Sequence, residues 1–263
     1  MKRNKNYLPF LILLIVHTWM LAFTFYRKKD RKKLFITLLS GMGLCFIFEY
    51  VVLSLFRAYR YKPRIFLNKD LDNFLGAIHS QAVFVPFTAL FLTAFKIGWK
   101  GKVFFSLYFA GIERLFLKWS IHQNHWWKTT YTMTLIPLFF YINDFWYGQL
   151  RKGSPIFKFG SLFLGILVSG LNLMYSMSIF RKFKFGRGRR HSWKEHFRVA
   201  PLYSFALSFV TAVIIKKNSG MKGILYSFAF SKFMDFSVMK TGIAMKNFRH
   251  VLINNSIHFL MIY

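Results

Sequence analysis

Residues 34–56 read LFITLLSGMGLCFIFEYVVLSLF, an apolar run of 23 residues in which Glu49 is the one charged side chain. About 20 apolar residues in a helix suffice to cross the roughly 30 Å hydrocarbon core of a bilayer. Backbone amides in lipid have no water to bind, and a helix satisfies them within one segment. Basic residues flank the run on both sides, RKKDRKK at 27–33 and RAYRYK at 57–62. This stretch therefore predicts a transmembrane helix with cationic ends.

The same pattern recurs along the chain. Further apolar runs of this kind occupy residues 7–26, 73–95, 103–119, 131–150, 159–180 and 199–215. The run 224–239 carries two charged residues, so it can cross the membrane, lie at its interface or line the bundle, whereas 251–263 is too short to cross. We therefore predict an all-α fold, a polytopic transmembrane bundle of seven or eight helices.

The order of the runs predicts two parts. Residues 1–150 form a five-helix transmembrane unit, and residues 151–263 form an appended unit of two or three helices with a basic loop at 181–198. The first run has no small-residue cleavage site after it and is followed by basic residues, so we expect a retained anchor and not a cleaved signal peptide.

The composition excludes several classes of protein. Of 263 residues, 38 are Lys or Arg and 8 are Asp or Glu, a formal charge of +30, while 55% are hydrophobic and only 17% charged. One cysteine excludes a disulfide scaffold, and 35 phenylalanines exclude a solvated disordered chain. The basic residues stand in every gap between apolar runs and are not gathered in one soluble segment, which argues against nucleic acid as a partner. We expect the Lys and Arg residues that flank the apolar runs to contact anionic lipid headgroups.

The charge pattern leaves the orientation open. For eight spans the two sides hold 18 and 15 Lys or Arg residues, a bias too small to apply the positive-inside rule. The loop 119–130 is the least basic, which favours an external position for it.

Two runs contain small residues at every fourth position. Such stripes lie on one helical face and allow close helix approach, which matters in lipid because the hydrophobic effect gives little drive there. We expect these two helices to pack against each other or against a second copy in a homo-oligomer. The stripes are Ser161, Gly165 and Ser169, and Ala200, Ser204, Ser208 and Ala212.

Polar side chains inside the apolar runs are candidates for function, because a charge at the centre of a bilayer costs at least about 2.5 kcal/mol and needs a partner. We single out one set as a candidate intramembrane polar site. It comprises Glu49, His79, Gln81, Glu113, Arg114 and Asp144.

The spacing of these residues predicts their partners. Glu113 and Arg114 are adjacent and project about 100° apart, so we expect Arg114 to reach Asp144 or Glu49, and Glu113 to reach a basic side chain or His79. His79 and Gln81 could form a hydrogen-bonded node between helices.

Three other local patterns have plainer interpretations. Lys232 and Asp235 stand at i and i+3 and are expected to neutralise each other. His122 and His125 have a spacing that places two imidazoles on one helical face, but zinc needs at least three protein ligands, so we predict no metal. Cys45 is expected to behave as a small hydrophobe.

Six cations in the 181–198 loop alternate with aromatic residues. Such a segment can lie on an anionic membrane surface with its rings buried among the headgroups, and recognition of a phosphorylated lipid is the more specific alternative. The residues are Arg181, Lys182, Lys184, Arg187, Arg189 and Arg190.

A set of short motifs resembles a known family. In chain order these are YRYKP (59–63), Asp72, HSQAVFVP (79–86), IERLFLK (112–118) and NHWWKTTYT (124–132). Their order is similar to that in uncharacterised small multi-pass membrane proteins of spore-forming Gram-positive bacteria, over about 49–150. The resemblance implies a five-helix unit in a bacterial cytoplasmic membrane and brings no assigned activity.

The sequence holds no nucleophile elbow, zinc-protease motif or phosphate-binding glycine loop, and it predicts no cofactor. Three functions stay open. The first is a non-catalytic structural or envelope-associated membrane protein. The second is a small transporter or channel that uses Glu113, His79, Asp144 and Arg114. The third is a membrane-embedded enzyme that acts on a lipid phosphate, although the chain offers few clustered acids or histidines for it.

Overall fold

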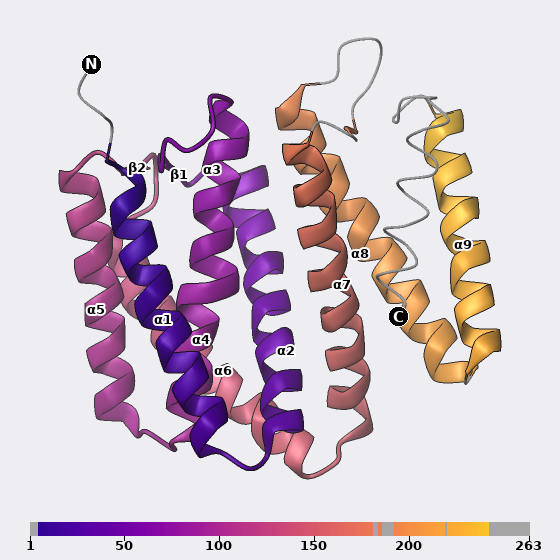
Figure 1. The fold of residues 1–263 in the computed structure, drawn as a ribbon, viewed down its shortest axis with the longest axis horizontal. Coiled ribbons are helices and arrows are strands. Elements are labelled where there is room, and N and C mark those ends of the chain that lie inside the picture. Colours follow the sequence, from indigo (N-terminus) through magenta and orange to yellow (C-terminus); the bar gives the residue numbers. More distant parts are fainter. Residues whose placement is uncertain (1–4, 181–183, 186–191, 219, 242–263) are drawn as a thin grey trace. The chain divides into compact units, whose positions relative to one another are not determined.

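The structure is a computed structural model, which describes residues 5–180, 184–185, 192–218 and 220–241 (Figure 1). Within these ranges the chain forms eight continuous helices, two of which contain a π-helical segment (η). This confirms the prediction of an all-α bundle with seven or eight helices. The elements are α1 (Tyr7–Arg27), α2 (Arg31–Glu49), η1 (Tyr50–Leu55), β1 (Tyr59–Tyr61), α3 (Lys69–Ile78), η2 (His79–Phe84), α4 (Val85–Ala94), α5 (Trp99–Lys118), β2 (His122–Asn124), α6 (Thr129–Arg151), α7 (Pro155–Ile179), α8 (Trp193–Lys217) and α9 (Met221–Lys240).

Five of the helices in the described part of the chain are long and apolar enough to span a membrane. They are Tyr7–Arg27, Arg31–Leu55, Lys69–Ala94, Pro155–Ile179 and Trp193–Lys217. The expected spans 103–119 and 131–150 are helical but are not among these five. Lysines, Glu113 and Arg114 reduce the hydropathy of α5, and tyrosines, Asn143, Asp144 and Gln149 reduce that of α6. The run 224–239 lies in helix α9, and 251–263 lies outside the described residues.

The chain divides into two compact units, Met1–Lys158 (unit 1) and Phe159–Tyr263 (unit 2). In unit 1 the helices run up and down, and β1, β2 and the start of α3 lie at the same end of the bundle as the start of α1 (Figure 1). Helix α4 is central: it contacts α1, α2 and α6, and all of its residues except Phe91 are buried. A helix that is apolar on every side is expected to be enclosed by others.

A short antiparallel sheet closes one end of unit 1. Tyr59 pairs with Asn124, and Tyr61 pairs with His122. The backbone N–H of Tyr61 also donates to Asn73 Oδ1 of α3 at 2.7 Å. Asp72 accepts the backbone N–H groups of residues 64–66 at 2.8–3.1 Å, which holds the loop that follows β1. The sheet therefore fixes two loops, from distant parts of the sequence, over the bundle.

Unit 2 packs α7, α8 and α9 around an apolar cluster that includes Met174, Tyr203 and Leu207. Helix α8 begins with a capping box, in which Ser192 Oγ accepts the Glu195 N–H at 3.1 Å and Glu195 accepts the Ser192 N–H at 3.2 Å. The whole small-residue stripe of α8 is buried, and its Ser204 hydroxyl contacts Met174 Sδ of α7 at 3.1 Å. In the α7 stripe Ser161 is buried, while Gly165 and Ser169 are partly buried.

Candidate functional site

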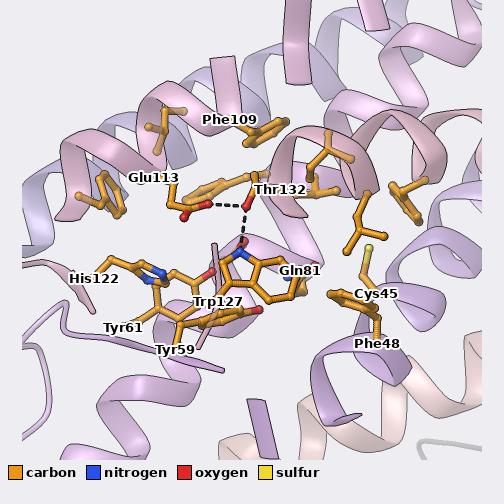
Figure 2. Close-up of a pocket in the computed structure, with 18 of the residues that line it drawn as sticks. Cys45, Phe48, Tyr59, Tyr61, Gln81, Phe109, Glu113, His122, Trp127 and Thr132 are labelled. Atoms are coloured by element: carbon orange, nitrogen blue, oxygen red, sulfur yellow. Dashed lines mark hydrogen bonds between the residues drawn. The ribbon is translucent and has the colours of Figure 1, made fainter. Parts of the chain in front are cut away.

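Unit 1 contains a partly open cavity of about 340 Å³ between α1, α2, η2, α5 and α6, with β1, β2 and Trp127 at one end (Figure 2). Most of its wall is apolar and aromatic. The polar side chains in the wall are Tyr59, Tyr61, Ser80, Gln81, Glu113, His122 and Thr132. The volume lies at the lower end of the range of about 300–1,000 Å³ for small-molecule sites. The cavity is therefore the candidate binding site of unit 1.

The β1–β2 pair brings an aromatic group to the cavity. Tyr59 and Tyr61 are two residues apart, so their side chains leave the same face of the strand. The ring of His122 lies 5.1 Å from that of Tyr59 and 4.7 Å from that of Tyr61, between centroids, and the Trp127 ring lies 5.4 Å from Tyr59. Burial raises the pKa of both tyrosines above the ordinary range, so their hydroxyls stay protonated and can donate hydrogen bonds.

Glu113 lies in the cavity wall and accepts hydrogen bonds from neutral groups. Its Oε1 accepts from Asn124 Nδ2 at 3.1 Å and from Thr129 Oγ1 at 2.9 Å, and its Oε2 accepts from Thr132 Oγ1. Trp127 Nε1 donates to Thr132 Oγ1 at 3.0 Å, which extends the network across the cavity (Figure 2). The expectation that Glu113 binds a basic side chain or His79 is therefore wrong, because the β2 loop and the first turn of α6 supply these donors instead.

Glu49 forms a second acidic centre just outside the cavity wall. It is 5% exposed, and its Oε2 accepts from Tyr59 Oη at 2.6 Å and Gln81 Nε2 at 3.0 Å. Within the described part of the chain, its Oε1 has no hydrogen-bond partner. Glu49 directly precedes η1, and Gln81 lies within η2. Single-turn π-helical segments often occur at functional sites.

The remaining candidates of the polar set do not join this centre. His79 Nδ1 bonds to the carbonyl of Leu75 in its own helix at 2.8 Å, so of the expected node only Gln81 reaches another helix. Arg114 is exposed. Asp144 forms an ion pair with Lys102 and accepts from Thr93 Oγ1. The expected pairing of Arg114 with Asp144 or Glu49 is therefore wrong, since both acids have other partners.

The two histidines of the 122–125 segment are not on one helical face. His122 begins β2 and lines the cavity, whereas His125 follows the strand and its Nδ1 bonds to the Arg57 carbonyl at 2.7 Å. Among the described residues there is no group of three or more His, Cys, Asp or Glu side chains that could hold a metal ion. Cys45 is buried and lines the cavity.

Burial lowers the pKa of His122 to about 4, and the nearby Glu113 carboxylate offsets only part of this effect. The unfolded chain, with an ordinary pKa near 6.5, then binds more protons than the folded chain between these values. We expect this contribution to stability to be complete above pH 6.5 and to fall by roughly 3 kcal/mol as the pH drops to 4. Thermal unfolding of the wild type and His122→Gln at pH 7.5 and 4.5 checks this: the variant should lose less stability on acidification. Equal losses would contradict a neutral, buried His122.

In unit 2 the structure describes the predicted ion pair and one of the six predicted headgroup contacts. Lys232 Nζ lies 3.0 Å from Asp235 Oδ2, which confirms the expected local pair. Lys184 lies over the Trp193 ring at 4.5 Å from its centroid. The other five basic residues predicted to contact headgroups, Arg181, Lys182, Arg187, Arg189 and Arg190, lie outside the described residues.

A serine–histidine pair in unit 2 was not predicted. Ser178 Oγ lies 2.7 Å from His196 Nε2, which at first suggests an activated nucleophile. However, His196 Nδ1 accepts the backbone N–H of Phe185 at 3.1 Å, so in the neutral ring Nε2 carries the proton. Nε2 then donates to Ser178 Oγ, which itself donates to the Met174 carbonyl at 2.8 Å. In this tautomer His196 cannot accept the serine proton, and the pair joins α7 to α8.

Comparison of the chain with protein-family models, with curated proteins and with solved structures finds no match. The resemblance of residues 49–150 to a bacterial family stays a prediction.

Proposed function

We propose that this chain is a multi-pass protein of a cell membrane whose unit 1 binds an amphipathic small molecule taken up from the bilayer. The observation that carries the proposal is the cavity of about 340 Å³, which combines a long apolar wall with polar groups gathered toward one end. Protein interiors are normally close-packed, with few voids larger than a water molecule. A cavity of this size with convergent polar groups is therefore a candidate binding site.

The wall formed by α6 favours entry of a ligand into the cavity from the lipid that surrounds the bundle. Leu138 and Ile142 line the cavity and are 53% and 40% exposed, and Phe48 of α2, also in the wall, is 37% exposed. Apolar side chains that border both the cavity and the outer surface of the bundle suit a ligand that moves between lipid and protein. The apolar part of the ligand would lie along α2 and α6, and its polar end near the β1–β2 sheet.

This arrangement supports binding more than transport. Of the four residues expected to line a pathway, only Glu113 lines the cavity. Asp144 is bound to Lys102, His79 bonds within its own helix and Arg114 is exposed. A continuous polar route through unit 1 would need these side chains to share one space, as polar residues do in transporters.

Filling the cavity tests the proposal. Ile136→Trp adds bulk to the wall, and Met133→Trp adds the same bulk to an exposed position of α6 outside the wall. We expect native mass spectrometry of the detergent-purified wild type, titrated with dodecyl-chain amphiphiles, to show a saturable one-to-one adduct. Ile136→Trp should weaken that adduct at least tenfold, and Met133→Trp should leave it unchanged. No adduct in the wild type, or equal adducts in all three proteins, would overturn the proposal.

A further inference from the structure

The charge of the cavity wall is opposite to that of the chain. The sequence contains 38 Lys and Arg residues against 8 Asp and Glu, yet none of the described residues that line the cavity is Lys or Arg. Glu113 is in the wall, and Glu49 lies directly behind Tyr59 and Gln81, which are in the wall. His122, also in the wall, is neutral at pH 7 because burial lowers its pKa to about 4. The wall itself therefore offers an acid and neutral groups, while Lys62, a cation that acts on His122, lies outside it.

Some other acidic residues of the described chain have a lysine as ion-pair partner, which Glu113 lacks. Asp144 pairs with Lys102, and Asp235 pairs with Lys232. Glu113, in contrast, has three neutral donors and, within the described ranges, no ion-pair partner. The three hydrogen bonds replace part of the hydration that this half-buried carboxylate loses in an apolar wall, but they bring no counter-charge. A cationic ligand would supply that counter-charge.

Aromatic rings surround the space beside Glu113. Figure 2 shows Tyr59, Tyr61 and Trp127 grouped on one side of the cavity, with Glu113 on the other. The Tyr59 ring lies 5.5 Å from Tyr61 and 5.4 Å from Trp127, between centroids. A cation within about 6 Å of such ring faces is attracted to them, and several rings together recognise quaternary ammonium groups. The same enclosure lacks the Arg and Lys donors that a phosphate requires.

We infer that the ligand of unit 1 is an amphipathic cation, an amine or quaternary ammonium with an apolar tail, whose head lies between Glu113 and the rings of Tyr59, Tyr61 and Trp127. This inference rests on the proposed function, since it names the class of molecule that the same cavity takes. The tail would lie against the apolar wall of α2 and α6. A lipid phosphate, the ligand expected for an enzyme of phosphorylated lipids, does not fit this end of the cavity.

Three probes with the same twelve-carbon chain test the inference on the intact protein in nanodiscs. They are dodecyltrimethylammonium, dodecanol and dodecanoate, which differ in the charge of the head. We expect the cation to bind at least tenfold more tightly than dodecanol, and dodecanoate to bind most weakly. Glu113→Gln should bring the affinity for the cation to that for dodecanol, whereas Asp70→Asn, which removes a charge from an exposed position of α3, should keep the preference.

The outcomes separate the two claims. If dodecanol binds as tightly as the cation, the inference is wrong and the proposed binding function stands. If no probe binds, both are wrong. If the preference survives Glu113→Gln, the assignment of Glu113 as counter-charge is wrong. The selectivity of the unaltered protein decides the inference by itself, so it is tested even where the variant does not fold.

Discussion

Asp144→Asn is expected to lower the free energy of unfolding by about 2 kcal/mol, because it leaves the buried Lys102 charged and without a counter-ion, while the 36% exposure of the Asp144 side chain screens part of their interaction. The Lys102 side chain is only 4% exposed, and its Nζ lies 3.9 Å from the centroid of the Tyr141 ring. Asparagine still accepts a hydrogen bond at this position, so the loss would report the missing charge and not the missing acceptor. Thermal or dodecyl-sulfate unfolding of the protein in mild detergent measures the difference.

Two further variants isolate the charge effect. Lys102→Met combined with Asp144→Asn removes both charges, and we expect it to recover most of the stability, since a buried pair contributes little over apolar residues of similar volume. Asp70→Asn removes the same charge from an exposed position and should change stability by less than about 0.5 kcal/mol. If Asp144→Asn and Asp70→Asn have equal effects, Lys102 does not depend on Asp144.

The sequence predicted the features that are set by residues close together in the chain. The helices follow from apolar runs long enough to cross a bilayer, and the Lys232–Asp235 pair follows from its i and i+3 positions on one helix. The sequence also placed three polar residues within helices, because each interrupts an apolar run: Glu49, Gln81 and Glu113.

What the sequence did not predict depends on contacts between distant segments. The residues around 57–62 and 119–128 read as connections between helices, the first basic and the second much less so, yet backbone hydrogen bonds join them into β1 and β2. Strands of three residues have too short a pattern to recognise, and their pairing brings Tyr59, Tyr61 and His122 to the cavity. For the same reason the partners of Glu113 could not be predicted: all three of its donors come from β2 and the start of α6, beyond the helix it belongs to.

Gly76→Ala is expected to destabilise unit 1 and to distort the cavity through Tyr61. A Cβ atom at position 76 would lie 2.4 Å from Tyr61 Cβ and 2.8 Å from Tyr61 Cγ, and these atoms at the root of the side chain cannot move without the backbone of β1. Such overpacking costs about 1–3 kcal/mol, which exceeds the gain of roughly 0.5–1 kcal/mol from replacing glycine in a helix.

Gly111→Ala is the matched control for this effect. Gly111 also lies within a helix, α5, but a Cβ there meets no atom within 4 Å. We expect Gly111→Ala to raise the unfolding temperature slightly and Gly76→Ala to lower it, with amphiphile binding reduced in Gly76→Ala alone, because Tyr61 forms part of the cavity wall and pairs with His122. A Gly76→Ala protein as stable and as able to bind as Gly111→Ala would show that α3 does not hold β1 against the bundle.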